Sequence, residues 1–229
     1  MARQPAAAPK KLTVFEVADN AAPKIGKLAS GDVSNDKTPV VSGSGAEPGA
    51  AIKVYDAGQV IASATAKADG TWSVEVSKEL LDGAHSITVT QTVNGVEGPK
   101  SDVLDFTLDT KVPAVSIDDL GETNNSKPVI LGQTNEPKSE IDVVIKDQNG
   151  NVIDGGKGVV DANGNWTYMP KNPLPEGAYG VEVKAKDSAG NQSAASGSGL
   201  VVDTTKPAVS IDPLKLTNDD TNRLIGESV

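Results

Sequence analysis

The chain has 229 residues, no cysteine and a formal net charge of −10. The lack of cysteine excludes disulfides, thiolate zinc sites and cysteine nucleophiles. With 31 acidic against 21 basic residues, the chain also lacks the concentrated cationic surface that a nucleic-acid groove or an anionic membrane requires. No apolar run reaches about 18 residues and no apolar signal segment opens the chain, so we expect neither membrane insertion nor a classical secretory signal.

The first predicted unit covers residues 23–109, and we assign residues 1–22 to an N-terminal lead or linker. In the unit, short runs of alternating apolar and polar residues are separated by Gly, Asn, Asp and Pro clusters, a pattern typical of half-buried antiparallel strands. Seven such runs lie near 23–29, 37–43, 51–55, 59–66, 71–77, 85–93 and 101–109. Helix has little support, since the one helical stretch, 76–81, is short enough to be a connecting turn.

The second unit, 110–203, repeats the first at an offset of 94 residues. Residues 108–118 match residues 202–212, and residues 68–72 match residues 162–166. The unit contains a longer hairpin around Asn149-Gly150, a turn pair whose positive φ angles suit tight hairpins. The remaining residues, 204–229, are enough for about two strands and form a partial third repeat.

Units of about 90 residues, with about seven short strands each, have the dimensions of immunoglobulin-like sandwiches. We therefore predict an all-β chain with two tandem immunoglobulin-like β-sandwiches and a truncated third repeat. Pro113 follows Asp109, and Pro207 follows Asp203, at the same spacing. Because proline fixes its own φ and holds the preceding residue extended, these segments should be stiff connectors that align the domains as a rod.

The reactive side chains do not form a catalytic set. The single histidine, His85, has Tyr179 as its counterpart in the second unit, which indicates a packing site with a polar tip rather than a catalytic base. Trp72 and Trp166 occupy equivalent places after hairpin turns, and we expect both to pack in the core, the alternative being an exposed ring that stacks on a sugar. Paired carboxylates such as Asp118-Asp119 have no pocket-forming partner. We expect the chain not to be an enzyme.

Several motifs that recur in register resemble the bacterial Ig-like repeats. They are residues 202–207, residues 163–166 and residues 187–191, and the resemblance extends from about residue 23 to the C-terminus. Such repeats form the extender stalks of giant adhesins and biofilm-associated surface proteins exported by type I secretion. The resemblance implies a secreted or cell-surface, non-enzymatic rod. We also expect the chain to be monomeric, with neighbouring repeats of a longer array and an unidentified host or matrix ligand as partners. The resemblance also implies that Ca²⁺ often stiffens the domain junctions.

Calcium needs six to eight oxygen ligands, which acidic loops at a junction can supply. We expect Asp187 and Asn191 to converge with Asp203 at the second junction, with Asp212, or Asp219 and Asp220, completing the shell. Asp109 holds the equivalent place at the first junction, but Val93 and Glu97 replace Asp187 and Asn191 there, so the second junction is favoured. The alternative is that these residues are turn formers and solvated charges.

The sequence thus predicts a structural spacer that holds an adhesive region away from a bacterial surface and supports cell adhesion or biofilm formation. Two alternatives remain open. One is a module that binds a glycan or protein through loops at one pole. The other is an accessory domain of an extracellular enzyme or of a phage surface protein, because fold alone does not separate these functions.

Overall fold

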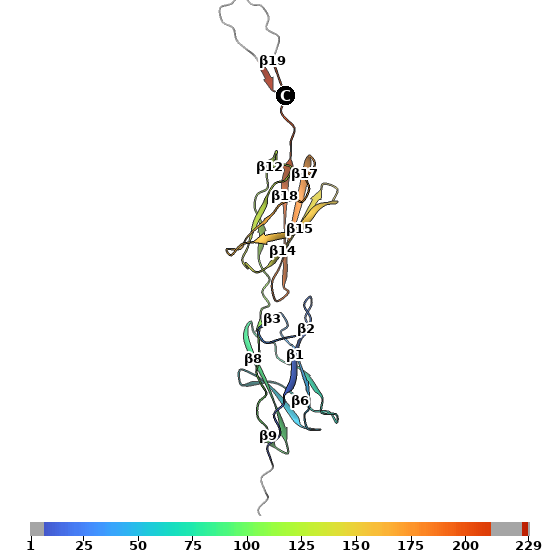
Figure 1. The fold of residues 1–229 in the computed structure, drawn as a ribbon, viewed down its shortest axis with the longest axis vertical. Coiled ribbons are helices and arrows are strands. Elements are labelled where there is room, and N and C mark those ends of the chain that lie inside the picture. The colour runs from blue at the N-terminus through green and yellow to red at the C-terminus, as the bar shows by residue number, and fades with distance from the viewer. Residues whose placement is uncertain (1–6, 212–225, 229) are drawn as a thin grey trace, which may run out of the picture.

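The computed structural model describes residues 7–211 and 226–228, and every regular element within these residues is a β-strand. The strands form two sandwiches that follow one another along the long axis of the molecule (Figure 1). The prediction of an all-β chain with tandem immunoglobulin-like sandwiches is confirmed. In this part of the chain, no helix is long and apolar enough to cross a bilayer.

The first sandwich, domain 1, consists of two sheets. Its strands are β1 (Val14–Asp19), β2 (Gly26–Lys27), β3 (Asp32–Ser34), β4 (Val40–Ser44), β5 (Ala51–Asp56), β6 (Gln59–Thr65), β7 (Trp72–Glu75), β8 (Gly83–Val93), β9 (Val96–Glu97) and β10 (Leu104–Leu108). One sheet has the order β2-β1-β4-β7, and the other has the order β3-β10-β8-β5-β6 with β9 paired to β8. β10 pairs antiparallel with β8 and parallel with β3.

Domain 1 begins earlier than the expected residue 23. Strand β1 pairs antiparallel with β4, where Val17 lies opposite Val41 and both side chains are fully buried. Leu12, ahead of β1, is only 1% exposed. The segment that the sequence assigned to a lead or linker therefore contributes a strand and core residues. Its apolar alternation is too short to indicate a strand by itself, and the pairing with β4 supplies the missing partner.

The second sandwich, domain 2, has one continuous strand order because β15 joins both layers. Its strands are β11 (Val115–Ile117), β12 (Glu122–Thr123), β13 (Ile130–Thr134), β14 (Glu140–Asp147), β15 (Val152–Val160), β16 (Asn165–Tyr168), β17 (Gly177–Lys186) and β18 (Gln192–Val202). β15 pairs with β14 over most of its length, and its last two residues pair with β16. The order is β11-β13-β16-β15-β14-β17-β18-β12. In domain 1 the corresponding strands, β6 and β7, end two different sheets.

A third unit starts with the same strand pairing as domain 2. Strand β19 (Val209–Ile211) pairs antiparallel with β20 (Gly226–Ser228), and Val209 lies opposite Ser228. Ninety-four residues earlier, Val115 lies opposite Thr134 in the β11–β13 pair. The repeat predicted from sequence therefore extends to strand register. Residues 212–225, which connect the two strands, lie outside the described residues.

The two tryptophans anchor the cores, as predicted. Trp72 and Trp166 are 2% and 0% exposed, so the alternative of a sugar-stacking ring is wrong for both. Each indole lies against a glycine of the neighbouring strand, where a Cβ would come within 2.6 Å of Trp72 at Gly43 and within 2.4 Å of Trp166 at Gly132. Nε1 of Trp166 donates a hydrogen bond to the carbonyl oxygen of Ser116 at 3.0 Å, whereas Nε1 of Trp72 is buried without a partner.

His85 and Tyr179 hold the same corner of each sandwich. Nε2 of His85 lies 2.8 Å from the carbonyl oxygen of Leu81, four residues earlier, and Nδ1 lies 2.8 Å from the Asp56 carboxylate. The Tyr179 hydroxyl donates to the carbonyl oxygen of Pro175, also four residues earlier, at 2.7 Å. Both contacts have the geometry of the tyrosine corner of immunoglobulin-like domains. The prediction of a packing site with a polar tip is confirmed.

Candidate metal site at the domain junction

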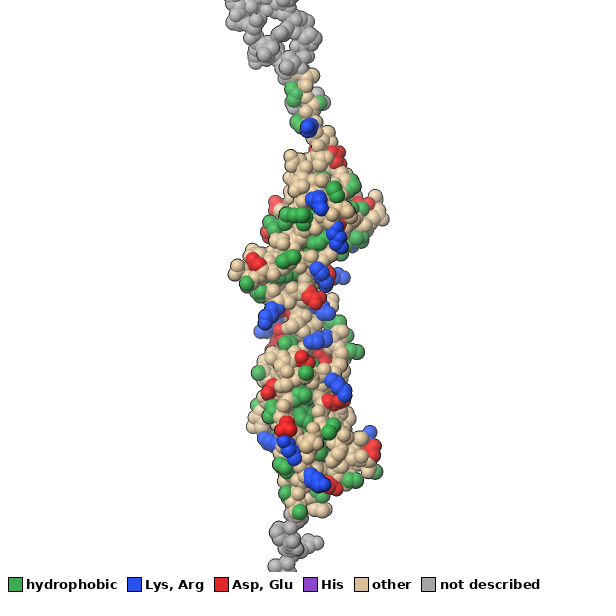
Figure 2. Space-filling view, in the orientation of Figure 1, with side chains coloured by type: hydrophobic (Ala, Val, Ile, Leu, Met, Phe, Trp, Pro, Cys, Tyr) green, Lys and Arg blue, Asp and Glu red, His purple; other side chains and the backbone are tan. Residues whose placement is uncertain are grey.

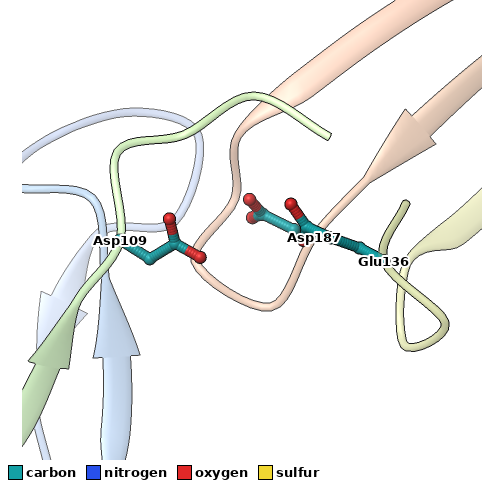
Figure 3. A group of neighbouring side chains, drawn as sticks. All are labelled: Asp109, Glu136 and Asp187. Atoms are coloured by element: carbon teal, nitrogen blue, oxygen red, sulfur yellow. The ribbon is translucent and has the colours of Figure 1, made fainter. Parts of the chain in front are cut away.

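Three carboxylates from the two domains meet at the junction (Figure 3). Asp109 directly follows β10 of domain 1, Glu136 lies in the turn after β13, and Asp187 lies in the hairpin between β17 and β18. One carboxylate oxygen of each lies within 4.8 Å of the others. Asp187 is buried and the other two are half-buried. The site therefore depends on both domains and exists only when they are stacked.

Local hydrogen bonds fix two of these carboxylates in place. Oδ1 of Asp187 accepts hydrogen bonds from the backbone N–H groups of Gly190 and Asn191, at 2.7 and 2.8 Å. The side-chain amide of Asn191 donates both to Oδ2 of Asp187 and to the carbonyl oxygen of Asp109, each at 2.8 Å. Oδ1 of Asp109 accepts from the N–H of Lys111 at 3.1 Å. Asn191 thus links the hairpin of domain 2 to the end of domain 1.

The cluster is electrostatically unfavourable without a cation. Burial raises the pKa of Glu136, and the negative charges of Asp187 and Asp109 raise that pKa further. None of the ion pairs found among the described residues involves these three carboxylates. Calcium prefers hard oxygen ligands, and one carboxylate oxygen of each of the three residues lies in the cluster. The residues therefore fit a hard divalent cation.

Further contacts clamp the same hairpin against domain 1. Nζ of Lys24 donates to the carbonyl oxygen of Ser188 at 3.3 Å, and the Asn35 side-chain amide donates to Oδ1 of Asn191 at 3.4 Å. Gly190 has a φ of +105°, and a Cβ at this position would lie 3.3 Å from the ring of Pro23. The glycine therefore provides both the backbone conformation and the close approach that the junction needs.

The structure brings together three of the five predicted metal ligands and separates a fourth. Asp109, Asp187 and Asn191 meet at the first junction, whereas Asp203 lies at the opposite pole of domain 2. The expected convergence of Asp187 and Asn191 with Asp203 is therefore wrong. The reason is strand direction. Gly177 at the start of β17 lies opposite Val202 at the end of β18, so Asp203 lies beside the start of β17. The hairpin that joins the two strands lies at their other end, roughly 30 Å away for the ten residues of β17.

Asp212 lies outside the described residues, as do Asp219 and Asp220. The residue 94 positions before Asp212 is Asp118, which is not a member of the junction cluster. Asp203 does reproduce the local structure of Asp109, since its Oδ1 accepts from the N–H two residues later, that of Thr205, at 2.9 Å. Asp109 and Asp203 thus share the same local turn structure.

At the pole of domain 1 that corresponds to the hairpin pole of domain 2, an ion-paired carboxylate takes the place of the cluster. Glu97 stands 94 residues before Asn191 and accepts hydrogen bonds from the hydroxyls of Tyr55 and Thr90, the second at 2.8 Å. Lys53 forms an ion pair with Glu97 at 3.2 Å. The hydroxyls of Tyr55 and Thr90, together with Lys53, lower the pKa of Glu97 to about 2. At this pole the ammonium group of Lys53 compensates the negative charge of Glu97.

Glu136 is the ligand candidate that sequence reasoning missed. It follows β13 at the pole of domain 2 that faces domain 1, and the turn is closed by a bond from the N–H of Ser139 to its carbonyl oxygen at 2.9 Å. The available signal was the Glu-Pro pair at 136–137, which repeats the pair at 47–48. That signal indicates a turn, and only the stacking of the domains brings the turn to Asp109.

Three solved structures that are similar to this chain come from tandem modules or adhesins. The fibronectin(III)-like modules of CbhA from Clostridium thermocellum match with 16% identity over 83% of this chain and 95% of that chain, at a TM-score of 0.44. The tetra-tandem repeat in the extending region of a large adhesion protein matches with 19% identity, 97% and 81% coverage, and a TM-score of 0.39. A 1.5-MDa bacterial ice-binding adhesin matches with 19% identity, 88% and 69% coverage, and a TM-score of 0.44. At these identities the likeness concerns the fold alone.

No curated protein matches the chain in sequence. The profile of the bacterial Ig-like domain matches residues 11–110 and residues 116–204, which cover most of the chain. The first matched segment begins just before Leu12 and β1, in agreement with the observed start of domain 1. Two sandwiches with equivalent corner contacts and equivalent core tryptophans thus correspond to two copies of one domain, and the chain belongs to the bacterial Ig-like domain family.

Proposed function

We propose that this chain is a spacer segment of a bacterial surface adhesin, in which tandem domains hold an adhesive region away from the cell and support cell adhesion or biofilm formation. The observation that carries the proposal is the end-to-end stacking of two sandwiches whose junction is fixed by direct hydrogen bonds, including those of Asn191 and Lys24 across it (Figure 1). Membership of the bacterial Ig-like family supports the same function. A spacer needs length and stiffness. The end-to-end stacking supports the first, and the hydrogen bonds across the junction support the second.

The surface and the polar groups support a non-enzymatic role at the cell exterior. On the face drawn in Figure 2, basic and acidic side chains are interspersed over both domains. The histidine of the chain is 7% exposed, and both of its ring nitrogens are engaged by Asp56 and Leu81. A general base needs a free nitrogen that reaches a substrate, which His85 does not offer. The partners we propose are neighbouring repeats and a host or matrix ligand bound elsewhere in the adhesin.

We also propose that Ca²⁺ binds at the first junction through Asp109, Glu136 and Asp187, while Asn191 positions two of them. When bound, the cation would supply positive charge and oxygen coordination between the domains. The carboxylate cluster and the raised pKa of Glu136 support this assignment. By the repeat, Asp203 would serve the next junction in the same way, with ligands from the following unit.

The test measures the distance between the domains. Because the chain has no cysteine, Ser73→Cys and Ala162→Cys introduce the only two thiols, both at exposed positions of different domains. Spin labels at these sites should give a narrow distance distribution by pulsed electron–electron double resonance. A broad distribution both with Ca²⁺ and with a chelator would contradict the spacer function. A narrow distribution that a chelator leaves unchanged would contradict only the role of calcium.

A further inference from the structure

A carboxylate of domain 1 holds the first residue of the connector to domain 2. Asp82, in the loop between β7 and β8, accepts two hydrogen bonds through Oδ1, from the backbone N–H of Thr110 at 3.0 Å and from its hydroxyl at 2.8 Å. Thr110 directly follows Asp109, where domain 1 ends. The Thr110 hydroxyl is the main cause that lowers the pKa of Asp82, so the acceptor is ionised at neutral pH. We call this contact the connector latch.

Domain 2 repeats the connector latch 94 residues later. Oε1 of Glu176 accepts from the N–H of Thr204 at 3.2 Å and from its hydroxyl at 2.6 Å. The hydroxyl of Thr205 adds contacts to both carboxylate oxygens of Glu176, at 2.9 and 3.0 Å. The carboxylate is present in both domains although aspartate is replaced by glutamate. The recurrence in register indicates that the latch belongs to the repeat and is not an incidental surface contact.

Three successive residues of the connector are held to domain 1. The N–H of Asp109 donates to the carbonyl oxygen of Ser34 at 2.9 Å, and the N–H of Thr110 donates to Asp82. The N–H of Lys111 donates to Oδ1 of Asp109 at 3.1 Å. The equivalent donors of domain 2, those of Asp203, Thr204 and Thr205, are engaged in the same way. The path of the backbone is therefore fixed before it reaches the next domain.

The loop that carries the latch carboxylate is itself fixed to the core. Leu81 directly precedes Asp82, and its carbonyl oxygen lies 2.8 Å from Nε2 of the buried His85. In domain 2 the residue before Glu176 is likewise bonded through its carbonyl oxygen, which accepts from the hydroxyl of Tyr179 at 2.7 Å. A carboxylate on a mobile loop would constrain the connector little. Here the corner contact holds the loop, so the latch connects the core to the connector.

We propose that Asp82 is a positioning residue of the domain junction, which acts through Thr110 to set the direction in which the connector leaves domain 1. The inference rests on the proposed spacer function and names the residue that controls the stiffness of the joint. Asp109, next to Thr110, offers its carboxylate to the candidate metal site and its carbonyl oxygen to Asn191, so the latch also presents these groups to domain 2. Glu176 does the same for the unit that follows domain 2.

The test compares the distance distribution between the two domains in variants of the connector latch. Spin labels at Ser73→Cys and Ala162→Cys report the distance, and a chelator removes any contribution of calcium. Asp82→Ala should broaden the distribution, whereas Asp82→Glu should keep it narrow because domain 2 has glutamate at this place. The matched control is Asp69→Ala. Its carboxylate makes the same two bonds, to the N–H and the hydroxyl of Thr71 at 2.9 and 2.7 Å, but in the hairpin between β6 and β7, so the distribution should stay narrow.

A second measurement is local to the connector. Hydrogen exchange of the Thr110 amide, followed by NMR, should be about two- to tenfold faster in Asp82→Ala, because one hydrogen bond to that amide is lost. Asp82→Glu should keep the slower rate. Thermal melts check that domain 1 of each variant is folded. If Asp82→Ala does not fold, Thr110→Val removes the hydroxyl bond of the latch and should broaden the distance distribution, and Thr110→Ser is its control.

Three results would overturn the proposal. The first is a distance distribution of Asp82→Ala that is as narrow as that of the unaltered chain, which would leave the spacer function intact. The second is an equal broadening in Asp82→Glu or in Asp69→Ala, because the effect would then not belong to the latch. The third is unchanged exchange of the Thr110 amide in Asp82→Ala. A distribution that is already broad in the unaltered chain, with Ca²⁺ as well as with the chelator, would overturn the spacer function together with the latch.

Discussion

Replacing each core tryptophan by phenylalanine should destabilise domain 2 more than domain 1. Both indoles are fully buried, so Trp72→Phe and Trp166→Phe remove the same ring atoms and create cavities of similar size. The polar contribution differs, because Nε1 of Trp166 donates to Ser116 at 3.0 Å while Nε1 of Trp72 has no partner. Losing this bond and leaving the Ser116 carbonyl without it costs about 1 to 3 kcal/mol. Removing the unpartnered N–H of Trp72 carries no such cost.

Urea unfolding of the full chain measures this difference. Far-ultraviolet circular dichroism follows both domains, and the fluorescence of the remaining tryptophan follows the unaltered domain alone. The loss in free energy of unfolding should be larger for Trp166→Phe than for Trp72→Phe by about 1 to 3 kcal/mol. Equal losses, or a larger loss in domain 1, would refute the reasoning that the indole hydrogen bond distinguishes the two cores.

Three further predictions concern the corner, the pole of domain 1 and the junction. His85→Tyr should keep most of the stability of domain 1. His85→Phe should cost about 1 to 3 kcal/mol, because the Leu81 carbonyl then loses its hydrogen-bond donor. Equal stabilities of the two variants in denaturant unfolding would contradict this prediction. The pKa of Glu97 is lowered from 4.5 to about 2, so its contribution is complete above pH 4.5 and is lost as the pH falls toward 2. Acid unfolding of Glu97→Gln, followed by Trp72 fluorescence, should lack that loss, and an acid profile like that of the unaltered chain would disprove the assignment. Calcium should raise the melting temperature of the unaltered chain, and Asp109→Asn should abolish that rise. Asp203→Asn, the matched control at the other pole of domain 2, should retain the rise. A rise that survives Asp109→Asn would remove the site from the first junction.

Local patterns in the sequence are enough to predict the strands and the identity of the core. The alternation at 51–55 and 85–93 corresponds to β5 and β8, because side chains on a strand point to opposite faces whatever the strand pairs with. The offset of 94 residues assigns Trp166 to the place of Trp72 and Tyr179 to the place of His85. Each equivalence holds in the structure because two copies of one fold reuse the same packing site. The sequence therefore determines the repeat, the fold class and the core.

Only the tertiary structure decides which residues meet at the ends of the domains. The pole at which the 187–191 hairpin lies depends on the direction of β17, and no local pattern reports that direction. Glu136 and Asp109 become neighbours through the stacking of two domains, although 27 positions separate them in the chain. The first strand, β1, likewise needs β4 to be recognised as part of the core. Alternation and turn formation are set by adjacent residues, whereas the assembly of a junction depends on long-range strand direction and on the pairing of surfaces.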